Sequence, residues 1–87
     1  MQIKFSKKFS KHYDKVPAKI RKAVQERLKL FKENKFAPVL NNHSLTGKYI
    51  GYRSINITGD WRALFREIED ETIAFFELLD TLSNLYG

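Results

Sequence analysis

The sequence predicts an α+β fold in which an N-terminal strand and a helical hairpin pack on a mainly antiparallel sheet. Three patterns support this prediction. Residues 1–5 alternate between apolar and polar side chains, residues 6–33 carry apolar side chains at helical spacing, and residues 49–79 contain three runs rich in aromatic and β-branched residues. Such runs, separated by short turns, are typical of antiparallel strands. The expected order is strand, helix, helix and three strands in a single domain, residues 1–87.

The first strand and first helix are predicted from local signals in residues 1–17. Ile3 and Phe5 alternate with polar residues, which favours a strand with one buried face. Ser6 can cap the helix that follows, and Phe5 can pack onto its first turns. Pro17 disfavours helical geometry at the preceding residue, so the first helix should end at Val16 and the second should start at Pro17.

The second helix is predicted to run from Pro17 to Glu33, because apolar residues recur on one side of this segment. Its apolar stripe is Ile20, Ala23, Val24, Leu28 and Phe31, and Lys19, Lys22, Lys29 and Lys32 cover the other side. The two helices therefore form a hairpin with a basic outer face.

The second half of the chain is predicted to be a loop followed by strands. Asparagine, proline and glycine interrupt residues 34–48, which indicates a loop. Strands are expected over Tyr49–Ile57, Trp61–Ile68 and Thr72–Leu79, with polar turns between them and a short tail over residues 80–87. The helices should cover one face of this sheet. The other face should be wholly or partly open, and an open face with polar side chains is a natural place for a site.

Composition narrows the class of protein. The hydrophobic fraction of 43% is enough for one packed core. The absence of cysteine excludes disulfides and thiolate metal sites. The first residues lack the apolar run of a signal peptide, and no segment approaches the length of a membrane span. We therefore expect a cytoplasmic protein without membrane contact.

The net charge of +6 is concentrated in the first part of the chain. Residues 1–35 contain twelve Lys and Arg against three acidic residues, whereas residues 36–87 contain four against seven. A basic half of this kind attracts a polyanion such as nucleic acid. A lysine-rich solvated helix surface explains the same pattern equally well.

The residues whose side chains are best suited to catalysis or binding cluster around the second and third strands of the chain. They are His43, Arg53, Asn56, Asp60, Trp61 and Arg62. Arg53 and Arg62 flank a tight hairpin and could converge on one phosphate, because a guanidinium donates two parallel hydrogen bonds to phosphate oxygens. Trp61 could stack on an unpaired base. Alternatively, the arginines pair with neighbouring acids, Trp61 belongs to the core and Asp60 only caps its turn.

Metal and cofactor chemistry is not expected. The only histidines are His12 and His43, which lie far apart in the sequence, and metal sites usually need three or four clustered ligands. The sequence also contains no glycine-rich phosphate loop.

The order of several short motifs resembles the YafQ-like branch of the RelE/ParE toxins. These motifs are His43-Ser44-Leu45-Thr46-Gly47, Gly51-Tyr52-Arg53, Gly59-Asp60-Trp61-Arg62 and the terminal Leu85-Tyr86-Gly87. The family pattern reads His-x-Leu-x-Gly, Gly-Tyr-Arg, x-Asp-Trp, and a terminal Gly-Thr-His-x-x-Leu followed by Tyr or Phe. The resemblance extends over essentially the whole chain and implies a RelE-like fold.

The resemblance implies the toxin of a type II toxin–antitoxin system that cuts mRNA in the ribosomal A site without a metal. It implies partners as well: a cognate antitoxin, the ribosome with its mRNA, and operator DNA through the antitoxin complex. The implied catalytic residues are His43, Arg53, Asp60, Arg62 and Tyr86. The implied RNA-binding residues are Trp61, Asn56, Lys48, Lys19, Lys22 and Lys29.

Three positions depart from the family pattern. Asn56 and Leu82 replace histidines, and Leu78 replaces an arginine. Leucine cannot transfer a proton, so the Leu82 change predicts reduced cleavage. The departures leave two alternatives open: a ParE-like inhibitor of DNA gyrase, and a catalytically inactive toxin that binds only antitoxin or RNA.

Overall fold

The computed structural model describes residues 1–87 and confirms the predicted α+β class. The elements are β1 (Gln2–Phe5), α1 (Lys7–Lys15), α2 (Ala18–Glu33), β2 (His43–Ser44), β3 (Arg53–Asn56), β4 (Trp61–Ile68), β5 (Ile73–Thr81) and α3 (Leu82–Tyr86). The strands form one five-stranded sheet in the order β1-β5-β4-β3-β2. The pairing of β1 with β5 is parallel, and the other pairs are antiparallel.

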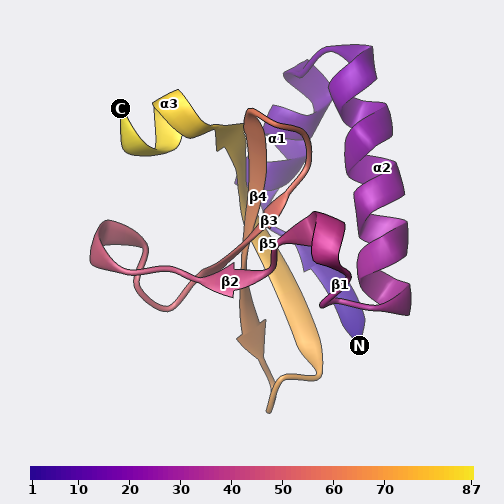
Figure 1. Cartoon of the computed structure of the whole chain (residues 1–87), viewed down its shortest axis with the longest axis vertical. Coiled ribbons are helices and arrows are strands. Elements are labelled where there is room, and N and C mark those ends of the chain that lie inside the picture. Colours follow the sequence, from indigo (N-terminus) through magenta and orange to yellow (C-terminus); the bar gives the residue numbers. More distant parts are fainter.

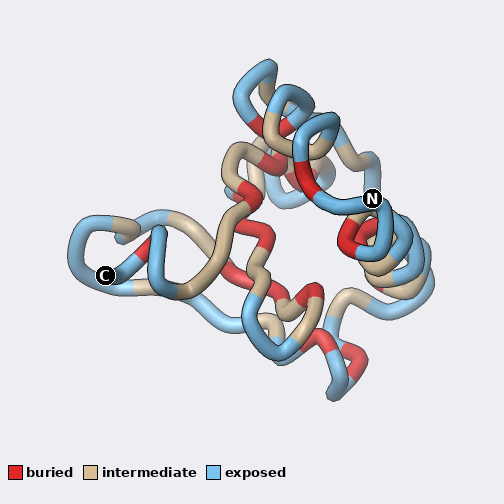
Figure 2. Tube along the Cα trace, turned by 90° about the horizontal axis from the view of Figure 1, so that it is seen from above, coloured by how far each residue is buried: buried red, intermediate tan, exposed pale blue.

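The helices lie on both sides of the sheet, but unequally. In Figure 1, α1 and α2 cover one side, whereas α3 and the loop before β3 project from the other side. Figure 2 shows the buried residues gathered along the strands and the inner side of the helices. None of the helices combines the length and the apolar composition that a membrane crossing requires.

The helical hairpin begins and turns for the reasons predicted from the sequence. The Ser6 hydroxyl accepts a hydrogen bond from the Phe9 backbone N–H at 3.0 Å and donates one to the Glu77 carbonyl oxygen at 3.1 Å. It therefore caps α1 and also fixes the helix to β5. Val16 is the C-cap of α1, and Pro17 is the N-cap of α2. The second helix therefore begins at Ala18, one position later than predicted.

The core lies between the helical hairpin and the sheet. Phe31 of α2 packs edge-on against Phe65 and Phe76, with ring centroids 5.2 and 5.5 Å away, and Phe65 and Phe76 stack at 4.8 Å. All three rings are buried. Aromatic pairs in these geometries add to the stabilisation that burial itself provides.

Two segments differ from the sequence prediction. The strand predicted over residues 49–57 is paired only from Arg53 to Asn56, because Gly47–Tyr49 forms a 3₁₀ turn and Gly51 adopts a φ of +92°. The predicted tail is ordered: β5 continues to Thr81, and α3 follows. The Thr81 hydroxyl caps α3 by accepting a hydrogen bond from the Asn84 backbone N–H at 3.2 Å.

Candidate functional site

The sheet face turned away from α1 and α2 is partly open: Ser54 and Leu64 are buried on it, and polar side chains lie around them. We call it the open face. Side chains alternate along a strand, and Ile55, Ala63 and Phe65 belong to the core on the helix side. The residues between them therefore lie on the opposite face. The register pairs Ser54 with Leu64, Asn56 with Arg62, Leu64 with Leu78 and Arg62 with Asp80. With Tyr52, Arg66 and Glu77, these residues make up the open face.

Arg62 is the basic group of the open face that has no acidic partner. Its Nη1 donates hydrogen bonds to the carbonyl oxygens of Thr58 at 2.8 Å and Trp61 at 3.0 Å. The two ion pairs of the structure, Lys35–Glu67 and Arg66–Glu77, do not involve it. Asp80 lies opposite Arg62 on β5, but its Oδ1 accepts from the Thr81 backbone and the Asn84 side chain. Arg62 is therefore fixed by backbone and keeps its charge for a ligand.

Tyr86 of α3 lies at the edge of the open face, within range of the Arg62 charge. Its ring packs edge-on against Tyr49, with centroids 5.5 Å apart. The Tyr49 hydroxyl donates to the Leu85 carbonyl oxygen at 3.1 Å, which ties α3 to the loop before β3. Burial is the largest cause of a raised pKa at Tyr86; Tyr49 adds to it, and the Arg62 charge acts in the opposite direction. The phenol is thus protonated at neutral pH and can donate a hydrogen bond.

A second polar group occupies the other end of the open face. Arg66 donates from Nε and Nη2 to the two carboxylate oxygens of Glu77 at 2.9 and 3.0 Å. The Arg66 guanidinium also lies 5.9 Å from the ring centroids of both Tyr52 and Phe75. Hydrogen bonding to Glu77 is the largest cause that raises the pKa of Tyr52. These contacts hold Arg66 rigidly, but its charge is already matched by a carboxylate.

His43 lies on the edge strand β2, directly opposite Ser54, and therefore on the open-face side. Its Nδ1 lies 2.7 Å from the Asn41 carbonyl oxygen. A carbonyl only accepts, so Nδ1 carries the proton and Nε2 is left as the basic nitrogen. The side chain is exposed and can meet a ligand.

Asp60 lies in the turn between β3 and β4, next to the start of α3. Its carbonyl oxygen accepts a hydrogen bond from the Leu82 backbone N–H at 2.9 Å. The Asp60 side chain is exposed. Position 82 of the terminal motif and Asp60 are thus neighbours in space.

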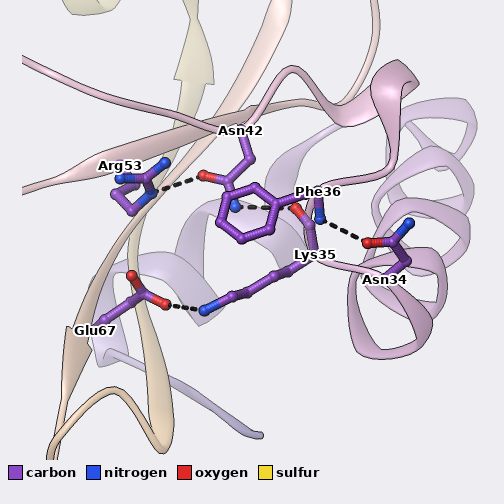
Figure 3. A network of polar contacts seen from close by, with 6 residues as sticks. All are labelled: Asn34, Lys35, Phe36, Asn42, Arg53 and Glu67. Atoms are coloured by element: carbon purple, nitrogen blue, oxygen red, sulfur yellow. Dashed lines mark hydrogen bonds and ion pairs between the residues drawn. The ribbon is translucent and has the colours of Figure 1, made fainter.

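The predicted convergence of Arg53 and Arg62 is wrong. Arg53 pairs with Phe65, whose ring is in the core, so the two arginines lie on opposite faces of the sheet. Figure 3 shows where Arg53 lies: its Nε donates to Asn42 Oδ1 at 2.9 Å, and Asn42 Nδ2 donates to the Lys35 carbonyl oxygen at 2.9 Å. Arg53 therefore fixes the loop after α2 to β3. Neither arginine is bound to a carboxylate.

Trp61 and the predicted lysines are also distributed over different surfaces. Trp61 is half-buried and packs against the core on the helix side, away from Arg62. Lys48 lies next to the open face, with Nζ 5.1 Å from the Tyr49 ring centroid. Lys19, Lys22 and Lys29 are exposed on α2, on the other side of the sheet. The structure contains no cluster of three or more His, Cys, Asp or Glu side chains placed to hold a metal ion.

Comparison with known proteins identifies the family. A family model described as "Bacterial toxin of type II toxin-antitoxin system, YafQ" matches residues 1–86. The chain belongs to the YafQ toxin family. No curated protein gave a significant match.

Solved structures agree on the fold. YafQ from Escherichia coli BL21(DE3) superimposes with a TM-score of 0.77 at 24% identity, covering 99% of this chain and 98% of that one. A YoeB/ParE toxin from Agrobacterium tumefaciens superimposes with a TM-score of 0.76 at 18% identity, covering 93% and 98%. The Escherichia coli DinJ–YafQ complex gives a TM-score of 0.73 at 22% identity, covering 99% and 98%. These likenesses support a RelE-like toxin fold.

The three departures from the YafQ pattern all lie at or beside the open face. Asn56 and Leu78 are on it, and Leu82 begins α3 next to Asp60. The Asn56 Oδ1 atom is buried and has no hydrogen-bond partner.

Four residues at or beside the open face were not predicted as site residues from the sequence: Tyr49, Tyr52, Arg66 and Glu77. Alternation along the strands could have found Tyr52 and Arg66, since they share a face with Asn56 and Arg62. Glu77 had no such signal, because it faces Arg66 through a register shift between β4 and β5 at Leu64 and Phe65. A bulge of this kind reverses the alternation that follows it.

Proposed function

We propose that this YafQ-family toxin is a ribosome-dependent mRNA endoribonuclease whose active centre is the Arg62 end of the open face. The observation that supports this most is a guanidinium held by backbone carbonyls, free of any carboxylate, beside the neutral phenol of Tyr86. A fixed cation next to a hydrogen-bond donor suits the charge that develops on a phosphoryl group during transfer.

The proposed reaction uses the RNA as its own nucleophile. The 2′-oxygen loses its proton and attacks the adjacent phosphorus, the bond to the 5′-oxygen breaks, and the leaving oxygen takes up a proton. The products are a 2′,3′-cyclic phosphate and a 5′-hydroxyl. The protein has to accept one proton, donate one and stabilise the phosphoryl oxygens.

The open face offers a group for each of these tasks. His43 Nε2 is the proposed base, and Arg62 stabilises the charge on the phosphoryl oxygens. Tyr86 donates a hydrogen bond to the phosphate or to the leaving oxygen. The half-buried Asn56 amide lies opposite Arg62 in the strand register and is the proposed polar contact to a ribose. Asp60, beside Leu82, is the second candidate for proton transfer.

Reduced activity follows from the same arrangement. Leu82 and Leu78 present apolar side chains where the YafQ pattern has ionisable ones. General acid–base groups contribute about 10²–10⁴-fold in rate, so cleavage should be slow compared with that of a toxin carrying the terminal histidine.

Partners follow from the family. We propose that a cognate antitoxin covers this toxin, since a solved relative is a DinJ–YafQ complex. The ribosome and its mRNA are the proposed target, and operator DNA would be reached only through the antitoxin. Inhibition of DNA gyrase, as by a ParE-like toxin, is the second candidate function. It is favoured by the apolar residues Leu78 and Leu82, which cannot take part in RNA cleavage, and by the fold shared with a YoeB/ParE toxin.

The test is a comparison of Arg62→Ala with Arg53→Ala in ribosome-dependent mRNA cleavage. Arg62→Ala should reduce the cleavage rate about 10²–10³-fold, the loss expected when one charge-stabilising donor is removed. Arg53→Ala, on the opposite face, should cleave within a few-fold of the parent chain if it stays folded by circular dichroism. Equal loss in both variants, or gyrase inhibition with intact mRNA, would contradict the proposal.

A further inference from the structure

A pocket of about 300 Å³ lies at the junction of the helical hairpin with the ends of β4 and β5. Most of its lining comes from the helix side of the sheet, but Asp80 of the open face and Asn84 of α3 also line it, so the pocket adjoins the Arg62 end of the open face. Its apolar surface comes from Trp61, Val16, Pro17 and Leu79, and its polar surface comes from His12, Lys15, Asp80 and Asn84. The Asp80 carboxylate already accepts hydrogen bonds from the Thr81 backbone and the Asn84 side chain. We call it the indole pocket. Its volume is at the lower end of the range for small-molecule sites.

Trp61 gives the pocket a fixed planar surface. The indole packs against the core on one side and is half-buried, so its orientation is set before any ligand arrives. An aromatic ring held in this way can stack on a flat, unpaired ring, and nucleobases are the flat rings that a basic protein meets most readily.

His12 and Asn84 supply hydrogen-bond acceptors. His12 Nδ1 lies 3.1 Å from the Leu79 carbonyl oxygen, so Nδ1 carries the proton and Nε2 is left to accept. Asn84 Nδ2 donates to Asp80 Oδ1 at 2.8 Å, which leaves the Asn84 carbonyl oxygen to accept. These two acceptors match the amino and imino groups on a base edge.

Lys15 supplies a cation at the rim. It is exposed at the end of α1 and lines the pocket, and neither ion pair of the structure involves it. An ammonium in this position can meet the phosphate attached to a base that is stacked on Trp61.

We propose that the indole pocket binds one unstacked nucleobase of single-stranded RNA. This inference rests on the proposed function only in taking RNA as the ligand. Trp61 directly precedes Arg62, so one RNA strand that crosses the end of β4 could place a phosphate at Arg62 and a base in the pocket. The base can come from mRNA or from ribosomal RNA, since both present the same chemistry.

The test uses the fluorescence of Trp61, the only tryptophan of the chain. AMP and a short single-stranded RNA should quench it saturably, whereas ribose 5-phosphate at equal ionic strength should not. Lys15→Glu should weaken the apparent affinity for the RNA about fivefold or more. Lys11→Glu is the matched control, because Lys11 is exposed on the same helix but does not line the pocket. His12→Ala should weaken binding of AMP, which carries the base.

The outcomes separate this inference from the proposed nuclease. Arg62→Ala should lose mRNA cleavage and keep the quenching of Trp61 fluorescence. If the parent chain does not cleave mRNA at all, the proposed nuclease fails, but base binding in the indole pocket is still tested by the quenching. Two results would contradict base binding in the indole pocket. One is quenching by ribose 5-phosphate as strong as that by AMP, and the other is an equal loss of RNA affinity in Lys11→Glu and Lys15→Glu.

Co-sedimentation with ribosomes identifies the source of the base. Weaker binding of Lys15→Glu to vacant ribosomes, relative to Lys11→Glu, assigns the base to ribosomal RNA. Weaker binding only to ribosomes carrying mRNA assigns it to mRNA. No difference between the two variants on either kind of ribosome would overturn the role of the pocket on the ribosome.

Discussion

At the residue scale, position 82 combines a structural and a chemical role. The Leu82 backbone N–H binds the Asp60 carbonyl oxygen and so joins the start of α3 to the β3–β4 turn. This contact uses only backbone and is independent of the side chain. The leucine side chain, which is only partly buried, has no group able to move a proton. The position is therefore structurally tolerant and chemically limiting.

Leu82→His should increase ribosome-dependent cleavage by up to about 10²-fold, because it places a group that titrates near neutral pH beside Asp60. The rate of mRNA cleavage with purified ribosomes is the measurement. Leu82→Gln is the control, since glutamine is polar but does not transfer protons at neutral pH. An equal rate in both variants would show that polarity, not proton transfer, limits this chain.

The side chains of the site were predictable only where their strand face was predictable. His43, Asn56, Arg62 and Tyr86 were found from motif positions, and they lie at or beside the open face. Arg53 was misplaced because a step of three residues from Asn56 along β3 reaches the other face. Arg53 had been placed by its distance from the hairpin turn, whereas alternation within the predicted strand puts it on the face of Ile55 and Ile57.

At the element scale, β4 and β5 are joined by one ion pair at their irregular register. Arg66 and Glu77 bridge the two strands next to the bulge, and Tyr52 of the loop before β3 adds a third side chain. Burial pushes the pKa of Glu77 upward. The hydrogen bonds from Arg66 and Tyr52 and the Arg66 charge outweigh it, so the pKa is lowered. The bridge thus favours the carboxylate form in the folded state.

Because the pKa of Glu77 is lowered in the folded state, the bridge stabilises the fold at pH values above the ordinary glutamate pKa of about 4.3. This stabilisation is lost as the pH falls below the pKa of Glu77 in the folded protein. Glu77→Gln should therefore lower the free energy of unfolding at pH 7 by about 1 kcal/mol or less, since Arg66 is substantially exposed. The difference from the parent chain should disappear in strongly acidic solution. Urea unfolding at several pH values measures it, and Glu71→Gln in the exposed β4–β5 turn is the control. A difference that stays constant with pH would exclude the ionic contribution.

Elements with strong local patterns were predicted well, and elements fixed by distant contacts were not. The predicted bounds of the strand Trp61–Ile68 are those observed. The predicted strand over residues 49–57 was too long, because Gly51 and the 3₁₀ turn break it. The parallel pairing of β1 with β5 joins residues about seventy positions apart, which no local periodicity encodes. α3 was missed because its five residues are too few for a periodic signal.

At the scale of the whole molecule, positive charge and the candidate active centre lie on different sides. Lys19, Lys22 and Lys29 are exposed on α2, whereas Arg62 and Tyr86 lie across the sheet. A short RNA on one face cannot contact both sets. A ligand that surrounds the toxin can, as the proposed ribosomal target would. The charge distribution therefore fits a target much larger than its mRNA alone.

Replacing Lys19, Lys22 and Lys29 together by Gln should weaken ribosome binding and reduce the slope of log affinity against log salt by up to about 2–3, because each lysine–phosphate contact releases about one counterion. Binding measured over a range of KCl concentrations gives the slope. Lys35→Gln is the control, since Lys35 already pairs with Glu67 at 2.7 Å. An unchanged slope in the triple variant would place these lysines outside the ribosome contact.

The parallel pairing of β1 with β5 has a consequence for vectorial synthesis. Until residues 73–76 have been translated, β1 has no neighbour in the sheet and the Ser6 hydroxyl lacks its acceptor at Glu77. The hairpin of α1 and α2 emerges first, with its apolar stripe uncovered. A nascent chain that stops in the β4–β5 turn therefore has neither a closed sheet nor an assembled site. If the toxin acts on ribosomes as proposed, the ribosome that makes it meets a complete site only after the last strand has left the exit tunnel.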